Sequence, residues 1–225
     1  MKKIGFIGAY DKTDLIIYIA KLLVENGLKV MVIDATTLQK TRYTVPCITP
    51  SKSYITTYED IDIAIGFETL QEIRNYMQTQ EFDYDIMLLD IDNRETFESL
   101  EMYTSDKNYF VTGFDNYSLK KGLEIVGKST EKLLMTKILF SRHMEKEENE
   151  YLNFLSFYYG VKWGKEKIYF PFEVGDNSVI IENQRSARIS FKELSPEYKE
   201  GMLEIISQIA PEIRLSDIKK MLKNI

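Results

Sequence analysis

Residues 4–36 read IGFIGAYDKTDLIIYIAKLLVENGLKVMVIDAT, and this stretch decides the fold. A short apolar run over 4–8 is followed by small and polar residues as far as Asp11. From Leu15 onward, apolar side chains recur at helical spacing until Asn26-Gly27, a pair typical of a helix end. A second continuous apolar run, 29–33, is typical of a strand buried on both faces. This order of strand, loop, helix and strand predicts a βαβ unit with parallel strands.

The alternation of strands and helices continues along the chain. Further strands are predicted over 62–66, 84–89, 108–112, 136–141 and 167–172, and further helices over 67–78, 117–134, 147–159, 197–209 and 216–224. This pattern predicts an α/β fold with a doubly wound, mostly parallel sheet flanked by helices. Ligands of such sheets bind outside the carboxyl ends of the strands. We expect one domain over 1–212, followed by a C-terminal amphipathic helix over 213–225.

Composition excludes several classes of function. The net charge of −6 counts against nucleic acid as a partner, because duplex binding needs clustered Lys and Arg. Cys47 and His143 are the only residues of their types, so neither an intrachain disulfide nor a Cys/His zinc cluster can form. No apolar run approaches the roughly 18 residues of a membrane-spanning helix. We therefore expect a cytoplasmic protein.

Three predicted strand ends carry recognisable motifs. They are 8–15 (GAYDKTDL), 32–36 (VIDAT) and 88–92 (LLDID). Together they resemble the MinD/ParA family of P-loop ATPases, including its TadZ/CpaE-type members, which place pilus and secretion machinery. In that family a Gly-rich loop ending in Gly-Lys-Thr-Thr follows the first strand, Asp-Ala-Asp follows the second, and an Asp ends a later apolar strand. The resemblance covers roughly residues 1–210.

The resemblance implies a role for each matching residue. Gly8, Lys12 and Thr13 would bind ATP, with Lys12 at the β- and γ-phosphates. Thr13 and Asp90 would hold Mg²⁺, and Asp34 would orient the attacking water as the catalytic residue. Asp34 and Asp90 could instead cap the loops that follow their strands.

The loop also departs from the family pattern. Gly8 is the only glycine between the first strand and Lys12, although glycines let the backbone wrap phosphates. Asp11 stands where the family has the Gly before its Lys, which puts a carboxylate beside the expected phosphates. Asp11 and Asp14 suit a helix N-terminus, whose free N–H groups and dipole they can satisfy. These departures predict a degenerate phosphate loop that has lost ATP and Mg²⁺, with little or no hydrolysis.

Two functions follow from these alternatives. The first is a degenerate MinD/ParA-like protein that acts as a positioning or assembly factor, through a homodimer and a protein partner in a larger assembly. The alternative is a working ATP-dependent dimerisation switch that closes across Lys12, Asp34 and Asp90. A receiver-like domain with an acidic strand-end pocket ranks last, because the chain is too long for one such domain.

Two segments add candidate surfaces. The aromatic helix within 147–159 has apolar side chains nearly all round, so it is either deeply buried or part of a protein interface. The segment 215–225 places its apolar side chains on one helical face and its lysines off it. It resembles the membrane-targeting tail of MinD, which implies a weak contact at the inner membrane surface; the alternative is a helix that packs on the domain.

Overall fold

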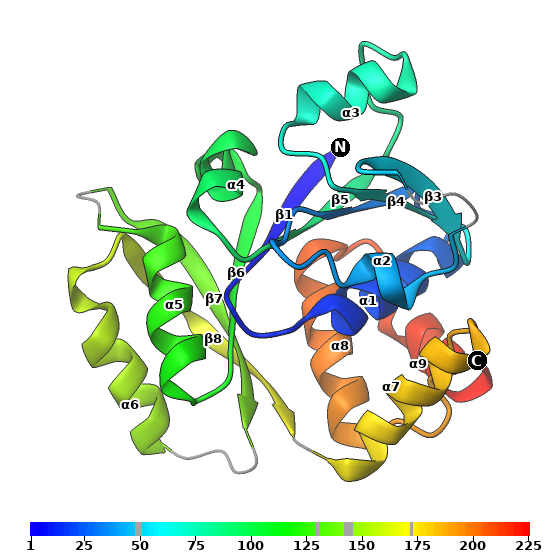
Figure 1. Cartoon of the computed structure of the whole chain (residues 1–225). Coiled ribbons are helices and arrows are strands. Elements are labelled where there is room, and N and C mark those ends of the chain that lie inside the picture. Colours follow the sequence, from blue (N-terminus) through cyan, green and yellow to red (C-terminus); the bar gives the residue numbers. More distant parts are fainter. Residues whose placement is uncertain (48–50, 129–130, 142–145, 172) are drawn as a thin grey trace.

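The computed structural model describes residues 1–47, 51–128, 131–141, 146–171 and 173–225, so His143 lies outside the described part (Figure 1). Eight strands form one sheet in the order β3-β4-β2-β5-β1-β6-β7-β8. All neighbours pair in parallel except β3 with β4. The strands are β1 (Lys2–Ile7), β2 (Val30–Asp34), β3 (Tyr54–Tyr58), β4 (Ile61–Ile65), β5 (Ile86–Ile91), β6 (Lys107–Thr112), β7 (Leu133–Ser141) and β8 (Val161–Pro171).

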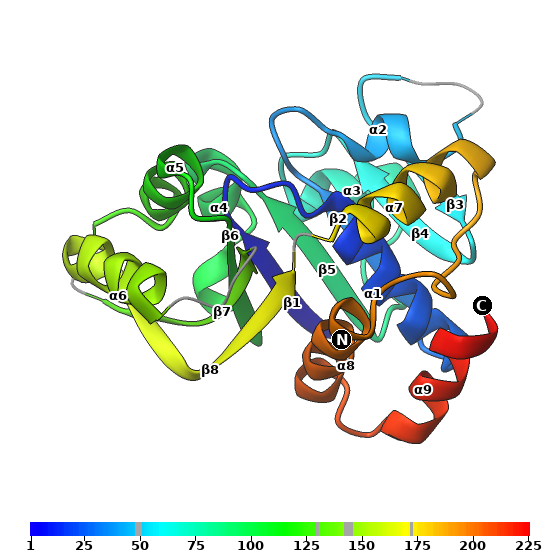
Figure 2. The ribbon, with the colours of Figure 1, turned by 90° about the horizontal axis from the view of Figure 1, so that it is seen from below.

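Helices cover both faces of this sheet (Figures 1 and 2). The first face carries α1 (Thr13–Glu25), α7 (Val174–Ser186), α8 (Pro196–Ile209) and α9 (Leu215–Asn224). The second carries α3 (Leu70–Met77), α4 (Arg94–Ser99), α5 (Asn116–Val126) and α6 (Lys146–Leu155). The short α2 (Thr41–Thr44) follows β2, and single 3-10 turns form η1 (Met102–Thr104) and η2 (Ser156–Tyr158). The predicted doubly wound, mostly parallel α/β fold is confirmed.

The chain reverses its winding direction between β1 and β5. β1 lies between β5 and β6, with Gly5 in register with Leu89 on one side and Asn108 on the other. From β1 the chain crosses β5 to reach β2, and from β5 it crosses β1 to reach β6. Adjacent strands whose connections leave in opposite directions open a crevice at their carboxyl ends. The sheet therefore places the loop after β1 beside the end of β5.

One predicted helix is wrong at its C-terminal end. The sequence pattern predicts a helix over 117–134, but α5 ends at Val126 and β7 begins at Leu133. Gly127 ends the helix with φ +72, a backbone angle that favours glycine, and its N–H donates to the Leu123 carbonyl. A Cβ at this position would also collide with the Arg94 guanidinium.

A second difference is the edge strand β3, which the sequence pattern does not predict. β3 and β4 form a hairpin whose two-residue turn is Glu59-Asp60, with φ of 51 and 65. Such turns need two residues at positive φ and usually contain Asn or Gly, so this one lacks its common sequence signal. β8 likewise begins earlier than predicted, at Val161, and the predicted helix over 147–159 is divided between α6 and η2.

The C-terminal helix packs on the domain. Ile218 and Leu222 of α9 are buried in the same core as α1 and α8. The Ser190 hydroxyl donates to the Ile225 carbonyl, which ties the end of the chain to the loop after α7. Membrane contact through 215–225 would therefore require this apolar face to leave the core. In the described part of the chain, no helix is both long and apolar enough to cross a bilayer.

Truncating Ile218 tests this packing. Ile218→Ala is expected to lower the free energy of unfolding by about 2–5 kcal/mol, because it removes a fully buried side chain. Leu215→Ala on the same helix is the control, since Leu215 is 41% exposed and its loss should cost well under half as much. Urea denaturation measures both. Equal, small effects would mean that α9 is not part of the core.

Candidate functional site

The loop after β1 is held by backbone contacts of its own. The Gly8 N–H donates to the Ile91 carbonyl at 3.0 Å, next to the end of β5. A Cβ at Gly8 would collide with the Val111 carbonyl oxygen, so glycine is needed for the close approach of the loop to β6. Tyr10 stacks on Phe140 with ring centroids 4.7 Å apart. Gly8 therefore serves the packing of this loop whether or not a phosphate binds.

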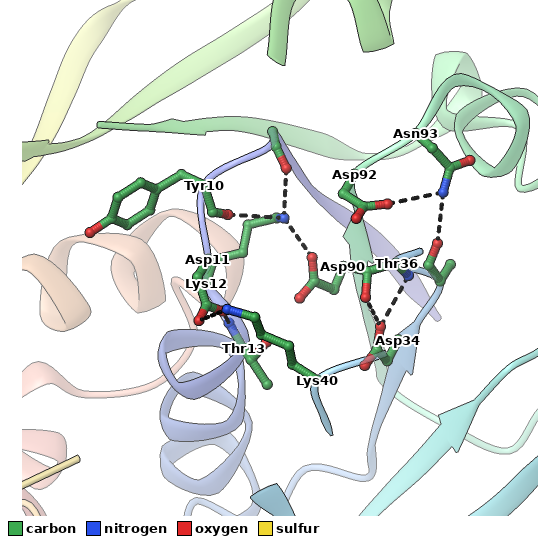
Figure 3. Close-up of polar contacts among 12 residues, drawn as sticks. Tyr10, Asp11, Lys12, Thr13, Asp34, Thr36, Lys40, Asp90, Asp92 and Asn93 are labelled. Atoms are coloured by element: carbon green, nitrogen blue, oxygen red, sulfur yellow. Dashed lines mark hydrogen bonds and ion pairs between the residues drawn. The ribbon is translucent and has the colours of Figure 1, made fainter. Parts of the chain in front are cut away.

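Lys12 turns inward from the start of α1 (Figure 3). Its ammonium lies 2.6 Å from Asp90 Oδ1 and donates to the Gly8 carbonyl at 2.9 Å and, more distantly, to the Tyr10 carbonyl at 3.5 Å. The side chains of Lys12 and Asp90 are 2% and 3% exposed. Lys12 and Asp90 thus meet at the ends of β1 and β5 as a buried ion pair, in which the ammonium has three oxygen partners.

The burial of this pair has an electrostatic consequence. Burial raises the pKa of Asp90 to about 7, against the opposing effect of the Lys12 charge. The carboxylate of Asp34, at the end of the neighbouring strand β2, adds to the increase. The charge of Lys12 therefore favours the ionised form of Asp90, which burial disfavours.

Asp34 has a local structural role in this arrangement. Its Oδ1 accepts from the backbone N–H and the hydroxyl of Thr36, at 3.0 and 2.6 Å. Its Oδ2 accepts from the Thr41 N–H at 3.0 Å, at the start of α2. Both oxygens of the expected catalytic residue thus fix the segment after β2, which is the loop-capping alternative that the sequence leaves open.

Asp11 and Asp14 differ in what they bind. Asp11 accepts from the Thr13 N–H at 3.2 Å, as expected for a residue at a helix start, and forms an ion pair with Lys40 at 2.7 Å. Burial opposes ionisation of Asp11, but these hydrogen bonds outweigh it and lower its pKa. Asp14 accepts from Gln184 of α7, with both oxygens 3.0 Å from Nε2. Burial raises the pKa of Asp14 to about 6, against the hydrogen bond from Gln184.

Sequence reasoning missed three members of this site. Lys40 follows β2 without a recognisable motif, and Gln184 lies 170 residues beyond its partner Asp14. Asp92 was visible in the motif after β5 but had no assigned role. It accepts from the N–H and hydroxyl of Thr37, at 2.9 and 3.1 Å, and so joins the segments after β5 and β2.

The hollow between these residues is small. Lys12, Thr13 and Asp90 line it together with Asp11, Asp92 and Lys40, and its volume is about 60 Å³. Pockets for nucleotide-sized ligands measure roughly 300–1,000 Å³. Three carboxylates face the position expected for phosphates, and the ammonium is bound to protein oxygens. Within the described residues, no group of three or more His, Cys, Asp or Glu side chains could hold a metal ion. In this arrangement the hollow is therefore smaller than a nucleotide-sized pocket.

The loop, the helix that follows it and the mostly parallel sheet define a P-loop NTPase-like α/β domain. The chain can be superimposed on a Cyanothece McdA variant in complex with ATP, with a TM-score of 0.61, 13% identity and coverage of 95% of this chain and 97% of that one. The superposition on the MinC:MinD cell division protein complex of Aquifex aeolicus has a TM-score of 0.57 and 13% identity, and it covers 90% of this chain and 93% of that one. The superposition on a putative plasmid partition protein of Borrelia burgdorferi bound to AMPPNP has a TM-score of 0.57 and 14% identity, and it covers 92% of this chain and 98% of that one.

The chain therefore has the fold of the MinD/ParA group of P-loop ATPases. At this identity the similarity concerns the fold. No protein-family model matches the sequence, and no curated protein matches it. The finer resemblance to TadZ/CpaE-type proteins stays a prediction.

Removing the charge of Lys12 tests how far the domain depends on the buried pair. Lys12→Met is expected to lower the free energy of unfolding by about 3–5 kcal/mol, because Asp90 is left buried and unpaired. Lys12→Met/Asp90→Leu should recover most of that loss. Lys40→Met breaks the half-exposed pair with Asp11 and should cost at most about 1 kcal/mol. Chemical denaturation at pH 7.5 measures all three; equal costs for Lys12→Met and Lys40→Met would contradict this dependence.

Proposed function

We propose that this protein is a MinD/ParA-fold positioning or assembly factor that works with little or no ATP hydrolysis. The observation that carries the proposal is the buried ion pair between Lys12 and Asp90 in the crevice between β1 and β5. This crevice is where a doubly wound sheet offers a ligand site. Here the residues that would meet phosphate and magnesium bind each other.

The ion pair opposes nucleotide binding energetically. To reach a phosphate, the Lys12 ammonium would leave a carboxylate at 2.6 Å and two carbonyl oxygens. Separating a buried pair in this way costs about 3–5 kcal/mol. That cost is subtracted from the binding free energy, and it corresponds to an affinity lowered roughly a hundredfold to a few thousandfold. Phosphate contacts with Lys12 would have to offset it.

Protein contacts would then carry the function. The comparison with the Aquifex MinC:MinD complex supports a protein partner for a chain of this fold. We propose a homodimer as the working form, acting in the cytoplasm within a larger assembly. Contact with the inner membrane surface through 215–225 is not part of this proposal, because Ile218 and Leu222 are buried in the core.

The alternative is an ATP-dependent dimerisation switch. One observation favours it: Lys12, Thr13 and Asp90 line the same hollow, at the positions that the family uses. In that case the Lys12–Asp90 pair is a resting state that ATP opens, and the loop has to widen well beyond about 60 Å³ to admit the nucleotide.

Thermal unfolding with and without 5 mM Mg²⁺-ATP or Mg²⁺-ADP separates the two functions. A ligand at 100 times its dissociation constant adds about 2.7 kcal/mol to native-state stability. For a chain of this length that raises the Tm by roughly 5 °C or more. We expect no shift for the natural sequence. A shift of this size that Lys12→Ala abolishes, each variant being compared with its own nucleotide-free sample, would establish the switch instead.

A further inference from the structure

Helix α6 and the turn η2 expose an aromatic face. Phe154, Phe157 and Tyr158 are 75%, 74% and 75% exposed, and Tyr151 is 43% exposed. Phe157 and Tyr158 stack edge to face, with centroids 5.2 Å apart. Tyr151 and Phe154 lie three residues apart on α6, and Phe157 and Tyr158 follow in η2, three and four residues beyond Phe154. We call these four side chains the aromatic face.

The side of α6 that meets the sheet combines polar contacts with the apolar packing of Leu152 and Leu155. The Lys137 ammonium donates to Asn149 Oδ1 at 2.6 Å and to Asn153 Oδ1 at 2.5 Å, and Lys137 itself is 2% exposed. The Trp163 indole N–H donates to the Ser156 hydroxyl at 2.9 Å. Leu152 is the fully buried apolar anchor of this helix in the described residues. Burial lowers the pKa of Lys137 to about 8, with a smaller contribution from Lys167.

An ordinary surface helix exposes its polar side, whereas α6 and η2 expose large aromatic side chains. The hydrogen bonds to Lys137 and Trp163 fix which side of α6 faces the sheet, so the aromatic face cannot turn inward without breaking them. Because the orientation of the helix is fixed, the aromatic face is exposed before any partner binds, which reduces the entropy lost on binding. Of the two alternatives that the sequence leaves open for this helix, the structure therefore favours an interface over deep burial.

The exposed area suits a dimer of standard size. An aromatic side chain presents about 200 Å². With the observed exposures, the four rings contribute roughly 530 Å², against the roughly 800 Å² that each partner buries in a standard interface. Residues around the rings need supply only the remaining third. A patch of this size is also at the upper end of what monomers leave uncovered.

Charges of opposite sign flank the face. Glu150 is exposed at the N-terminal end, on the same side of the helix as Phe154. Lys132 is exposed at the other end, where its ammonium donates to the Tyr159 carbonyl. A two-fold axis near Phe154 makes two copies of α6 antiparallel. Aromatic rings also pair well with like rings, edge to face or offset.

We propose that the aromatic face of α6 and η2 is the homodimer interface of this protein, with two copies packed antiparallel about Phe154. The inference rests on the proposed function, which has a homodimer as its working form, and it adds the surface and the symmetry. The face lies at the β7–β8 end of the sheet, away from α1 and the Lys12–Asp90 pair (Figures 1 and 2). Dimerisation through it needs no nucleotide.

Sedimentation equilibrium between 1 and 200 μM, without nucleotide, tests the proposal. The natural sequence should be a dimer, and Phe154→Ser/Phe157→Ser should raise the dimer Kd at least ~30-fold, as expected for central aromatic anchors. Tyr43→Ser is the matched control, since Tyr43 is 82% exposed on α2 and its removal should leave the Kd unchanged. Thermal unfolding checks that every variant is folded.

Several results would overturn the interface. They are a natural chain that stays monomeric at 200 μM and a dimer that tolerates Phe154→Ser/Phe157→Ser. Co-sedimentation with phosphatidylcholine–phosphatidylglycerol vesicles that this double variant abolishes would assign the face to lipid. A nucleotide-independent dimer that ignores these substitutions contradicts the interface alone, whereas a dimer that forms only with Mg²⁺-ATP contradicts the proposed function.

Discussion

The buried ion pair between Lys12 and Asp90 is the interaction on which the rest of the structure depends. It joins the loop after β1 to the end of β5, the two adjacent strands between which the winding of the sheet reverses. In a low-dielectric interior each charge requires the other, because either one alone would be costly to bury. The contact that joins the loop after β1 to β5 therefore also occupies Lys12 and Asp90, the two residues that the family resemblance assigns to phosphate and Mg²⁺.

Other acidic side chains at the carboxyl edge of the sheet are also bound by donors of the chain. Asp34 holds Thr36 and Thr41, Asp92 holds Thr37, and Asp11 binds Lys40. Each of these acidic groups is thus committed to a nearby donor from the chain itself. The aromatic face of α6 presents the opposite condition, since its large apolar side chains are mostly exposed. In the described part of the molecule, these acidic groups at the carboxyl edge of the sheet have partners within the chain, whereas the aromatic face of α6 and η2 is uncovered. This difference is consistent with function through association.

The sequence predicts the framework well because parallel strands buried on both faces leave continuous apolar runs. It also predicts that Lys12, Asp34 and Asp90 gather at one edge, since the carboxyl ends of parallel strands meet there. What it could not supply depends on contacts between distant segments. The hairpin turn Glu59-Asp60 lacks the usual glycine, and Gln184 meets Asp14 only after folding. The orientation of α6 was equally hidden, because apolar side chains lie nearly all round it and the hydrogen bonds to Lys137 determine the inner side.

A crystal structure grown with 10 mM Mg²⁺-ATP tests the central claim most directly. We expect the Lys12 ammonium to remain at ion-pair distance from Asp90, Gly8 and Tyr10 to keep their carbonyl contacts with it, and no nucleotide density to appear beside α1. A structure in which Lys12 has left Asp90 for a phosphate, with Mg²⁺ held at Thr13, would contradict this claim and define the protein as an ATP-dependent switch.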